Sequence, residues 1–149
     1  MGKKIKVKIG DLFEICTSKG FAYAQYSHHN ALCGALIRVL PGLFDQRPDH
    51  LRSIVTKNHL FVVFFPVQEA VDKHLVEIVG NYPIPVEAQQ FPLFRAGAIN
   101  VLTGTVKTWW LWDGDKEWKV ERMSPEEMRL PLREIVNDTL LIEKIESCA

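Results

Sequence analysis

The chain has 149 residues, 47% of them hydrophobic, and carries 18 basic and 18 acidic residues. This length suffices for one hydrophobic core without disulfides or a structural metal, so we predict a single domain over residues 1–149. The zero net charge excludes a global field that would draw the protein to nucleic acid or to an anionic membrane.

The amino-terminal half predicts β-structure. Strict alternation over residues 4–9 is typical of a half-buried strand with lysines on its outer face. Residues 12–17 and 21–27 flank Ser18-Lys19-Gly20, which predicts a hairpin with a left-handed glycine. Residues 34–40 predict the next strand, which ends at a Pro-Gly step.

The middle of the chain is more varied. The polar residues 45–58 predict a long excursion with at most one helical turn, whereas the apolar residues 59–65 predict the central strand of the sheet. A short helix and a strand ending at Gly80 are expected next. Three prolines at positions 83, 85 and 92 then predict an irregular covering loop over residues 81–94.

The carboxyl-terminal part predicts a hairpin followed by helices. Residues 107–113 and 117–121 bracket the turn step Asp113-Gly114. Ser124, Pro125 and Glu127 form a capping-box start, and Asp138 is expected to cap a last helix that carries Leu140, Leu141 and Ile145. The elements together predict an α+β fold, with a strongly bent, mostly antiparallel, barrel-like sheet and helices gathered at the carboxyl-terminal end.

Few residue patterns in the sequence suggest a catalytic site, a cofactor site or a metal site. The three cysteines are odd in number and form no C-x-x-C pair, which disfavours a disulfide framework and a zinc site. No two histidines have the helical spacing of a metal site, and no nucleophile elbow, phosphate loop, dinucleotide fingerprint or kinase signature is present. We therefore predict no catalysis, no cofactor and no metal.

Four tryptophans lie within ten residues, at positions 109, 110, 112 and 118. Such a concentration is more often a core layer with cross-strand pairs than a binding site. An antiparallel sheet often leaves one face wet, so we expect one of the four to be exposed as an anchor for a partner. Asp113 and Asp115 at the hairpin tip would present a small acidic feature to a basic partner.

Targeting signals are weak. The basic residues near the start alternate with apolar ones, and no signal-peptide core follows. No apolar segment approaches the roughly 20 residues that cross a bilayer. These features predict a soluble, cytoplasmic protein that does not contact membranes.

An ordered series of short motifs resembles the immunity protein 26 family of bacterial polymorphic toxin systems. The series runs through residues 10–15 (GDLFEI), 21–24 (FAYA), 79–83 (VGNYP), the aromatic hairpin at 110–114 (WLWDG) and a capped carboxyl-terminal helix. The chain departs from the family pattern at Cys16, where a proline is expected, and at Gln25-Tyr26, which replace a glycine-led strand. The resemblance implies a cytoplasmic protein that binds a cognate protein toxin and blocks its active site or docking surface, without catalysis.

The predicted partner-binding surface combines two tyrosines with the aromatic hairpin and one acid: Tyr23, Tyr26, Trp110, Trp112 and Asp113. Asp11 is added because Asp11 and Tyr23 match motif positions of the family, although Gly10-Asp11 could simply build a turn. One alternative is a small-molecule-binding or hydrolytic domain with its pocket inside the bent sheet, under residues 81–105. A second is single-stranded nucleic-acid binding, which the neutral charge disfavours. The sequence leaves the identity of the toxin and the oligomeric state open.

Overall fold

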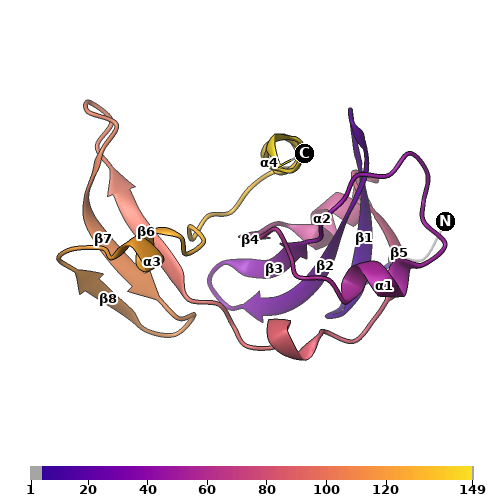
Figure 1. Ribbon diagram of the computed structural model, residues 1–149, viewed down its shortest axis with the longest axis horizontal. Helices are drawn as coiled ribbons and strands as arrows, with labels where there is room; N and C mark the ends of the chain where they lie inside the picture. Colours follow the sequence, from indigo (N-terminus) through magenta and orange to yellow (C-terminus); the bar gives the residue numbers. More distant parts are fainter. Residues whose placement is uncertain (1–4, 149) are drawn as a thin grey trace. The chain divides into compact units, whose positions relative to one another are not determined.

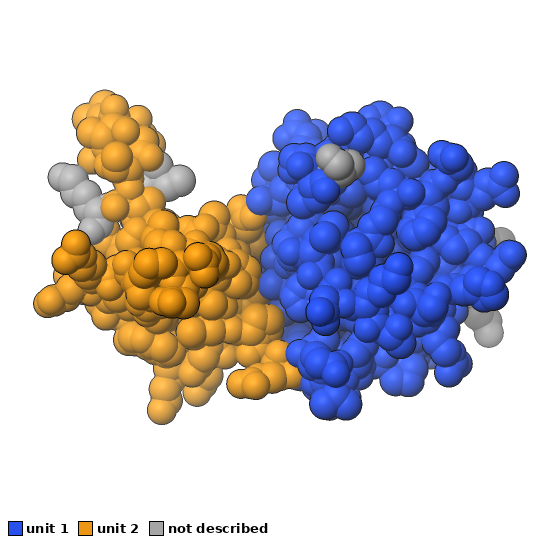
Figure 2. Space-filling view, in the orientation of Figure 1, with its two compact units in different colours: residues 1–89, 135–149 blue, residues 90–134 orange. Residues whose placement is uncertain are grey.

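The computed structural model describes residues 5–148, apart from the side chains of Ala98, Ile99 and Lys107. Over these residues it has eight strands in two antiparallel sheets and four α-helices, which confirms the α+β class (Figure 1). The sheets are not closed into a barrel, so the barrel-like expectation is wrong. The chain divides into two compact units, shown in Figure 2: a first unit of residues 1–89 and 135–149, and a second unit of residues 90–134.

The first unit is built on a sheet whose strands lie in the order β4-β3-β2-β1-β5. The strands are β1 (Asp11–Thr17), β2 (Gly20–Asn30), β3 (Gly34–Val39), β4 (Phe61–Phe64) and β5 (Glu77–Asn81). The helices of this unit are α1 (Leu51–Val55), α2 (Val67–Asp72), the single 3₁₀ turn η1 (Val86–Ala88) and α4 (Asp138–Ser147).

The β1–β2 hairpin forms where the sequence predicts it. Gly20 has a φ of 133°, and a Cβ at this position would lie 2.9 Å from the carbonyl oxygen of Phe44, so only glycine fits without strain. The register pairs Phe13 with Ala24 and Ile15 with Ala22. The small alanines leave room for the elements that cover this face.

Both faces of the five-stranded sheet are covered. On one face, Phe13, Ala24 and Ile37 belong to an apolar cluster that also contains residues of α2 and α4. On the other face, Leu12 and Tyr23 cluster with Ile54 and Val55 of α1. The sheet is therefore the middle layer of the first unit.

The second unit holds a three-stranded sheet in the order β6-β7-β8. Its elements are β6 (Phe94–Ile99), β7 (Val106–Trp112), β8 (Glu117–Val120) and the short α3 (Pro125–Met128). The turn between β7 and β8 contains the predicted Asp-Gly step, and Gly114 has a φ of 98°. The predicted capping box is present at α3, where the Ser124 hydroxyl accepts from the backbone N–H of Glu127.

Several expectations are corrected. The part of the predicted strand 4–9 that the structure describes has no strand, and Lys4 lies outside the described residues. The apolar β4 is an edge strand, not the centre, although a parallel bridge between Phe64 and Ile135 covers that edge. Helices α1 and α2 precede β5, so the helices are not all gathered at the carboxyl-terminal end. Asn137, rather than Asp138, caps the last helix by accepting from the N–H of Leu140.

Candidate functional site

Asp11, the first of the predicted partner-binding residues, is 3% exposed at the start of β1. Its carboxylate accepts from the backbone N–H of Lys8 at 2.9 Å and from the side-chain amide of Asn81 at 3.0 Å. The adjacent Gly10 has a φ of 94°, which suits the turn. Asp11 therefore ties the amino-terminal turn to β5, as the turn interpretation of Gly10-Asp11 predicts.

The two predicted tyrosines lie inside the first unit, on opposite faces of β2. Tyr23 is 1% exposed, and its hydroxyl donates to Glu14 at 2.7 Å; burial and this hydrogen bond raise the pKa of Tyr23. Tyr26 is 8% exposed, with its hydroxyl 3.3 Å from Nδ1 of His29. Their burial leaves little of either side chain for a partner, and a role in binding stays a prediction.

Trp110, Trp112 and Asp113 belong to the second unit. Trp112 is 3% exposed and packs against Phe91 and Phe94, with ring centroids 5.6 Å away in both pairs. Trp110 is half-buried, and Asp113 is exposed at the turn. Of the tryptophans, Trp118 is 42% exposed, which confirms the expectation that one of them reaches the surface.

The turn between β6 and β7 presents a feature that sequence reasoning missed. Val101 and Leu102 are adjacent, and each is 92% exposed. The turn is held by hydrogen bonds from Gly104 N to Asn100 O at 2.7 Å and from Leu102 N to the Asn100 side chain at 2.9 Å. Figure 1 shows this turn extending past the strands of its own sheet. The sequence did carry a signal for this exposed turn, because the aliphatic pair Val101-Leu102 comes shortly before Gly104.

A buried polar network lies on the α1 side of the five-stranded sheet. Arg38 of β3 is 1% exposed, and its Nε donates to Oε1 of Gln25 at 3.1 Å. The terminal nitrogens donate to the backbone oxygens of Val55 and of Lys57, the latter at 3.4 Å. Every acceptor is uncharged, and burial lowers the pKa of the guanidinium. The network fixes the end of α1 and the segment after it to the sheet.

A second charged group on this face is neutralised in a different way. Glu14 is 7% exposed and accepts from Nε of Arg47 at 2.7 Å and from Nη2 at 3.1 Å. This bidentate pair and the hydroxyl of Tyr23 hold the pKa of Glu14 below its ordinary value, against the opposing effect of burial. Arg47 also reaches Glu77 of β5 at 3.2 Å, so it clamps its own loop onto the sheet.

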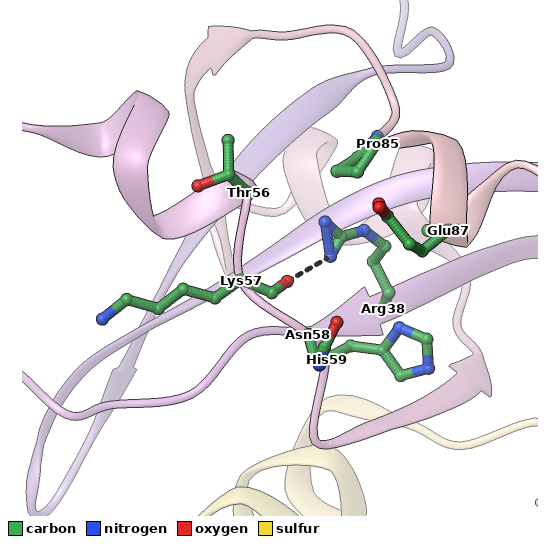
Figure 3. A pocket seen from close by; sticks show the side chains of 8 residues that line it. Arg38, Thr56, Lys57, Asn58, His59, Pro85 and Glu87 are labelled. Carbon is green, nitrogen blue, oxygen red and sulfur yellow. Dashed lines mark hydrogen bonds between the residues drawn. The ribbon is translucent and has the colours of Figure 1, made fainter.

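The candidate functional site is a cavity of about 200 Å³ beside Arg38, in the first unit (Figure 3). It is lined by Arg38, Thr56, Lys57, Asn58, His59, Pro85, Glu87 and Ala88. Figure 3 shows the Lys57 side chain running away from Arg38, whereas the Glu87 carboxylate turns toward the guanidinium. The cavity therefore has a buried cation at its base and an anion at its rim.

His59 adds a neutral polar group to this cavity. The residue is exposed overall, yet enough of its ring is covered that burial lowers its pKa, and the positive charge of Arg38 lowers it further. The imidazole is therefore uncharged at neutral pH and offers one donor and one acceptor. The site can recognise a polar group by hydrogen bonds from several directions.

Sequence reasoning missed the Arg38 cavity as a site. The signal was a lone arginine inside the apolar run of residues 35–40. A buried cation in such a run needs acceptors from elsewhere in the fold.

Within residues 5–148, no group of three or more His, Cys, Asp and Glu side chains is placed to hold a metal ion. None of the helices described has both the length and the apolar character needed to span a membrane.

Comparison of the chain with protein-family models, curated proteins and solved structures finds no match.

Proposed function

We propose that this chain binds a cognate protein toxin and neutralises it by occlusion, without catalysis of its own. The partner class follows from the ordered motifs that resemble the immunity protein 26 family. The observation that carries the proposal is the ordered, exposed aliphatic turn of Val101 and Leu102 in the second unit.

Two adjacent aliphatic side chains at 92% exposure gain nothing from the fold of their own unit. Covering a Val or Leu side chain completely is worth about 1.5–3 kcal/mol, so a partner with an apolar pocket would gain from both. The hydrogen bonds that hold the turn mean that little order has to be imposed on binding. A preformed tip of this kind suits insertion into the cleft of another protein.

The other end of β7 offers a second contact of different chemistry. Asp113 accepts from the backbone N–H groups of Asp115 and Lys116 at 2.9 and 2.7 Å, which fixes the turn and lowers the pKa of Asp113. Trp118, on β8 beside this turn, is 42% exposed. An aromatic anchor beside two carboxylates fits a basic protein surface.

The test begins with the reading frame that neighbours the gene, because immunity proteins of such systems are usually encoded next to their toxins. The purified product of that frame is titrated against this chain, and the two are co-expressed to measure survival. We expect tight binding and rescue of growth. A toxic neighbouring protein that this chain neither binds nor neutralises would contradict the proposal.

A matched pair of variants then locates the surface. The double substitution Val101→Ser with Leu102→Ser should weaken binding by roughly a hundredfold, since the buried area of two aliphatic side chains is lost. Leu32→Ser is the control, because Leu32 is 85% exposed but lies in the first unit. Equal loss of affinity in both variants would exclude the β6–β7 turn as the contact.

A further inference from the structure

The charges around the Arg38 cavity are arranged unusually. Arg38 is buried, and its hydrogen-bond acceptors are an amide oxygen and two backbone oxygens. Each terminal nitrogen of a guanidinium carries two N–H groups, and here each makes one hydrogen bond. A buried cation that has spare donors, and no bonded anion among residues 5–148, favours an incoming carboxylate.

The rim of the cavity supplies the opposite charge. Within residues 5–148 the Glu87 carboxylate makes no ion pair or hydrogen bond, although it turns toward the guanidinium (Figure 3). The Lys57 ammonium points elsewhere, and His59 is neutral, so the cavity carries one positive and one negative charge. A simple anion would be repelled by Glu87, and a simple cation by Arg38.

The size of the cavity limits the ligand. The volume of the cavity is about 200 Å³. Sites for drug-sized ligands are larger, at about 300–1,000 Å³. Pro85 and Ala88 give the cavity an apolar wall, and the side chains of Asn58 and His59 make no hydrogen bond within residues 5–148. The part of a ligand that enters the cavity is therefore compact.

We propose that this cavity binds a small zwitterion of amino-acid size, with its carboxylate toward Arg38 and its ammonium toward Glu87. Opposite charges at the two ends of the ligand match the opposite charges of the cavity. The carbon skeleton would lie against Pro85 and Ala88. This site is in the first unit and does not use the β6–β7 turn, so it is independent of toxin binding.

The test is an NMR titration of the full chain with three probes at constant ionic strength: β-alanine, acetate and ethylammonium. We expect β-alanine to shift the Asn58 and His59 side-chain resonances in a saturable manner, and to bind at least about tenfold more tightly than either single-charge probe. Acetate binding as tightly as β-alanine would overturn the proposal. The absence of a saturable shift with any probe would overturn it as well.

Variants separate recognition from stability. Glu87→Gln should weaken β-alanine binding by about tenfold and leave acetate binding equal or tighter, while the urea midpoint of unfolding stays unchanged. Glu121→Gln, at an exposed position in the second unit, is the control and should change neither. A lower unfolding midpoint for Glu87→Gln, with β-alanine binding unaltered, would make Glu87 a static counter-charge for Arg38 and overturn the proposal.

Discussion

The two faces of the five-stranded sheet are covered by different chemistry. The face toward α2 and α4 is an apolar cluster of 17 buried residues, among them Phe13, Leu141 and Ile145. The face toward α1 has a smaller apolar cluster of five buried residues, and it also holds Glu14, Gln25 and Arg38 in hydrogen-bonded networks. The first face stabilises the fold by burying apolar surface. The second face stabilises the fold only while each of its buried polar groups keeps its hydrogen-bond partner.

This difference between the two faces suggests that they have different roles: one face supplies stability, and the other fixes the positions of particular loops. Apolar contacts tolerate changes that conserve volume, because dispersion and burial have little directionality. The networks around Arg38 and Glu14 require particular loops in particular places, since their acceptors and donors come from residues 47, 55 and 57. The polar face thus positions the segments that line the Arg38 cavity, and the apolar face holds the sheet together.

The largest effect is expected on the apolar face. Phe13→Ala should reduce the free energy of unfolding by about 3–5 kcal/mol, because Phe13 is 2% exposed and its removal leaves a cavity. Urea unfolding followed by circular dichroism measures the loss. Val86→Ala, at a position 78% exposed, is the control and should be nearly silent. A loss under about 1 kcal/mol for Phe13→Ala would mean that this face collapses around the gap.

Arg38→Met tests the polar face directly. Methionine fills similar space but leaves three acceptors without their donor, so we expect a loss of about 2–3 kcal/mol, offset in part by removal of a buried charge. Urea unfolding again gives the value. A variant as stable as the parent chain would contradict the claim that the polar face depends on its hydrogen bonds for stability.

Glu14→Gln adds a dependence on pH. Because Arg47 lowers the pKa of Glu14 in the folded state, the carboxylate stabilises the fold above the ordinary pKa of Glu and loses this contribution as the pH falls through the lowered value. The variant should be about 1–2 kcal/mol less stable at pH 7, a figure reduced because Arg47 is half exposed. The difference should shrink below about pH 4. A difference that is constant from pH 7 to pH 3 would contradict this mechanism.

The smallest effect is expected for Tyr23→Phe, which removes only the hydroxyl that donates to Glu14. We expect a loss of about 1 kcal/mol, typical of one hydrogen bond. Tyr82→Phe is the matched control, because within residues 5–148 the Tyr82 hydroxyl makes no hydrogen bond. If the two variants unfold at the same urea concentration, the hydroxyl of Tyr23 contributes nothing to the polar face.

Local signals predicted much of this fold. The hairpin turns at Gly20 and at Asp113-Gly114 and the capping box at Ser124 depend on a few neighbouring residues, so the sequence shows them directly. The place of β4 depends on distant residues. Its composition predicts a central strand because it is apolar throughout, but Val136 N donates to Phe64 O at 2.9 Å and covers an edge.

The candidate site was harder to predict for the same reason. Period-2 alternation assigns Tyr23 and Tyr26 to opposite faces of β2 but does not reveal that both faces are covered. The Arg38 cavity arises from segments that lie 18 residues or more from Arg38 along the chain, at 56–59 and 85–88. Such encounters are set by tertiary packing, and no local pattern encodes them.

The first unit is interrupted in sequence, and this has a consequence for biosynthesis. Val136, Leu141 and Ile145 belong to its apolar cluster but follow the entire second unit along the chain. At a translation rate of about 5–20 residues per second, the nascent sheet waits several seconds for the helix that covers it. Until these residues have been made, one face of the nascent sheet lacks part of its apolar cover.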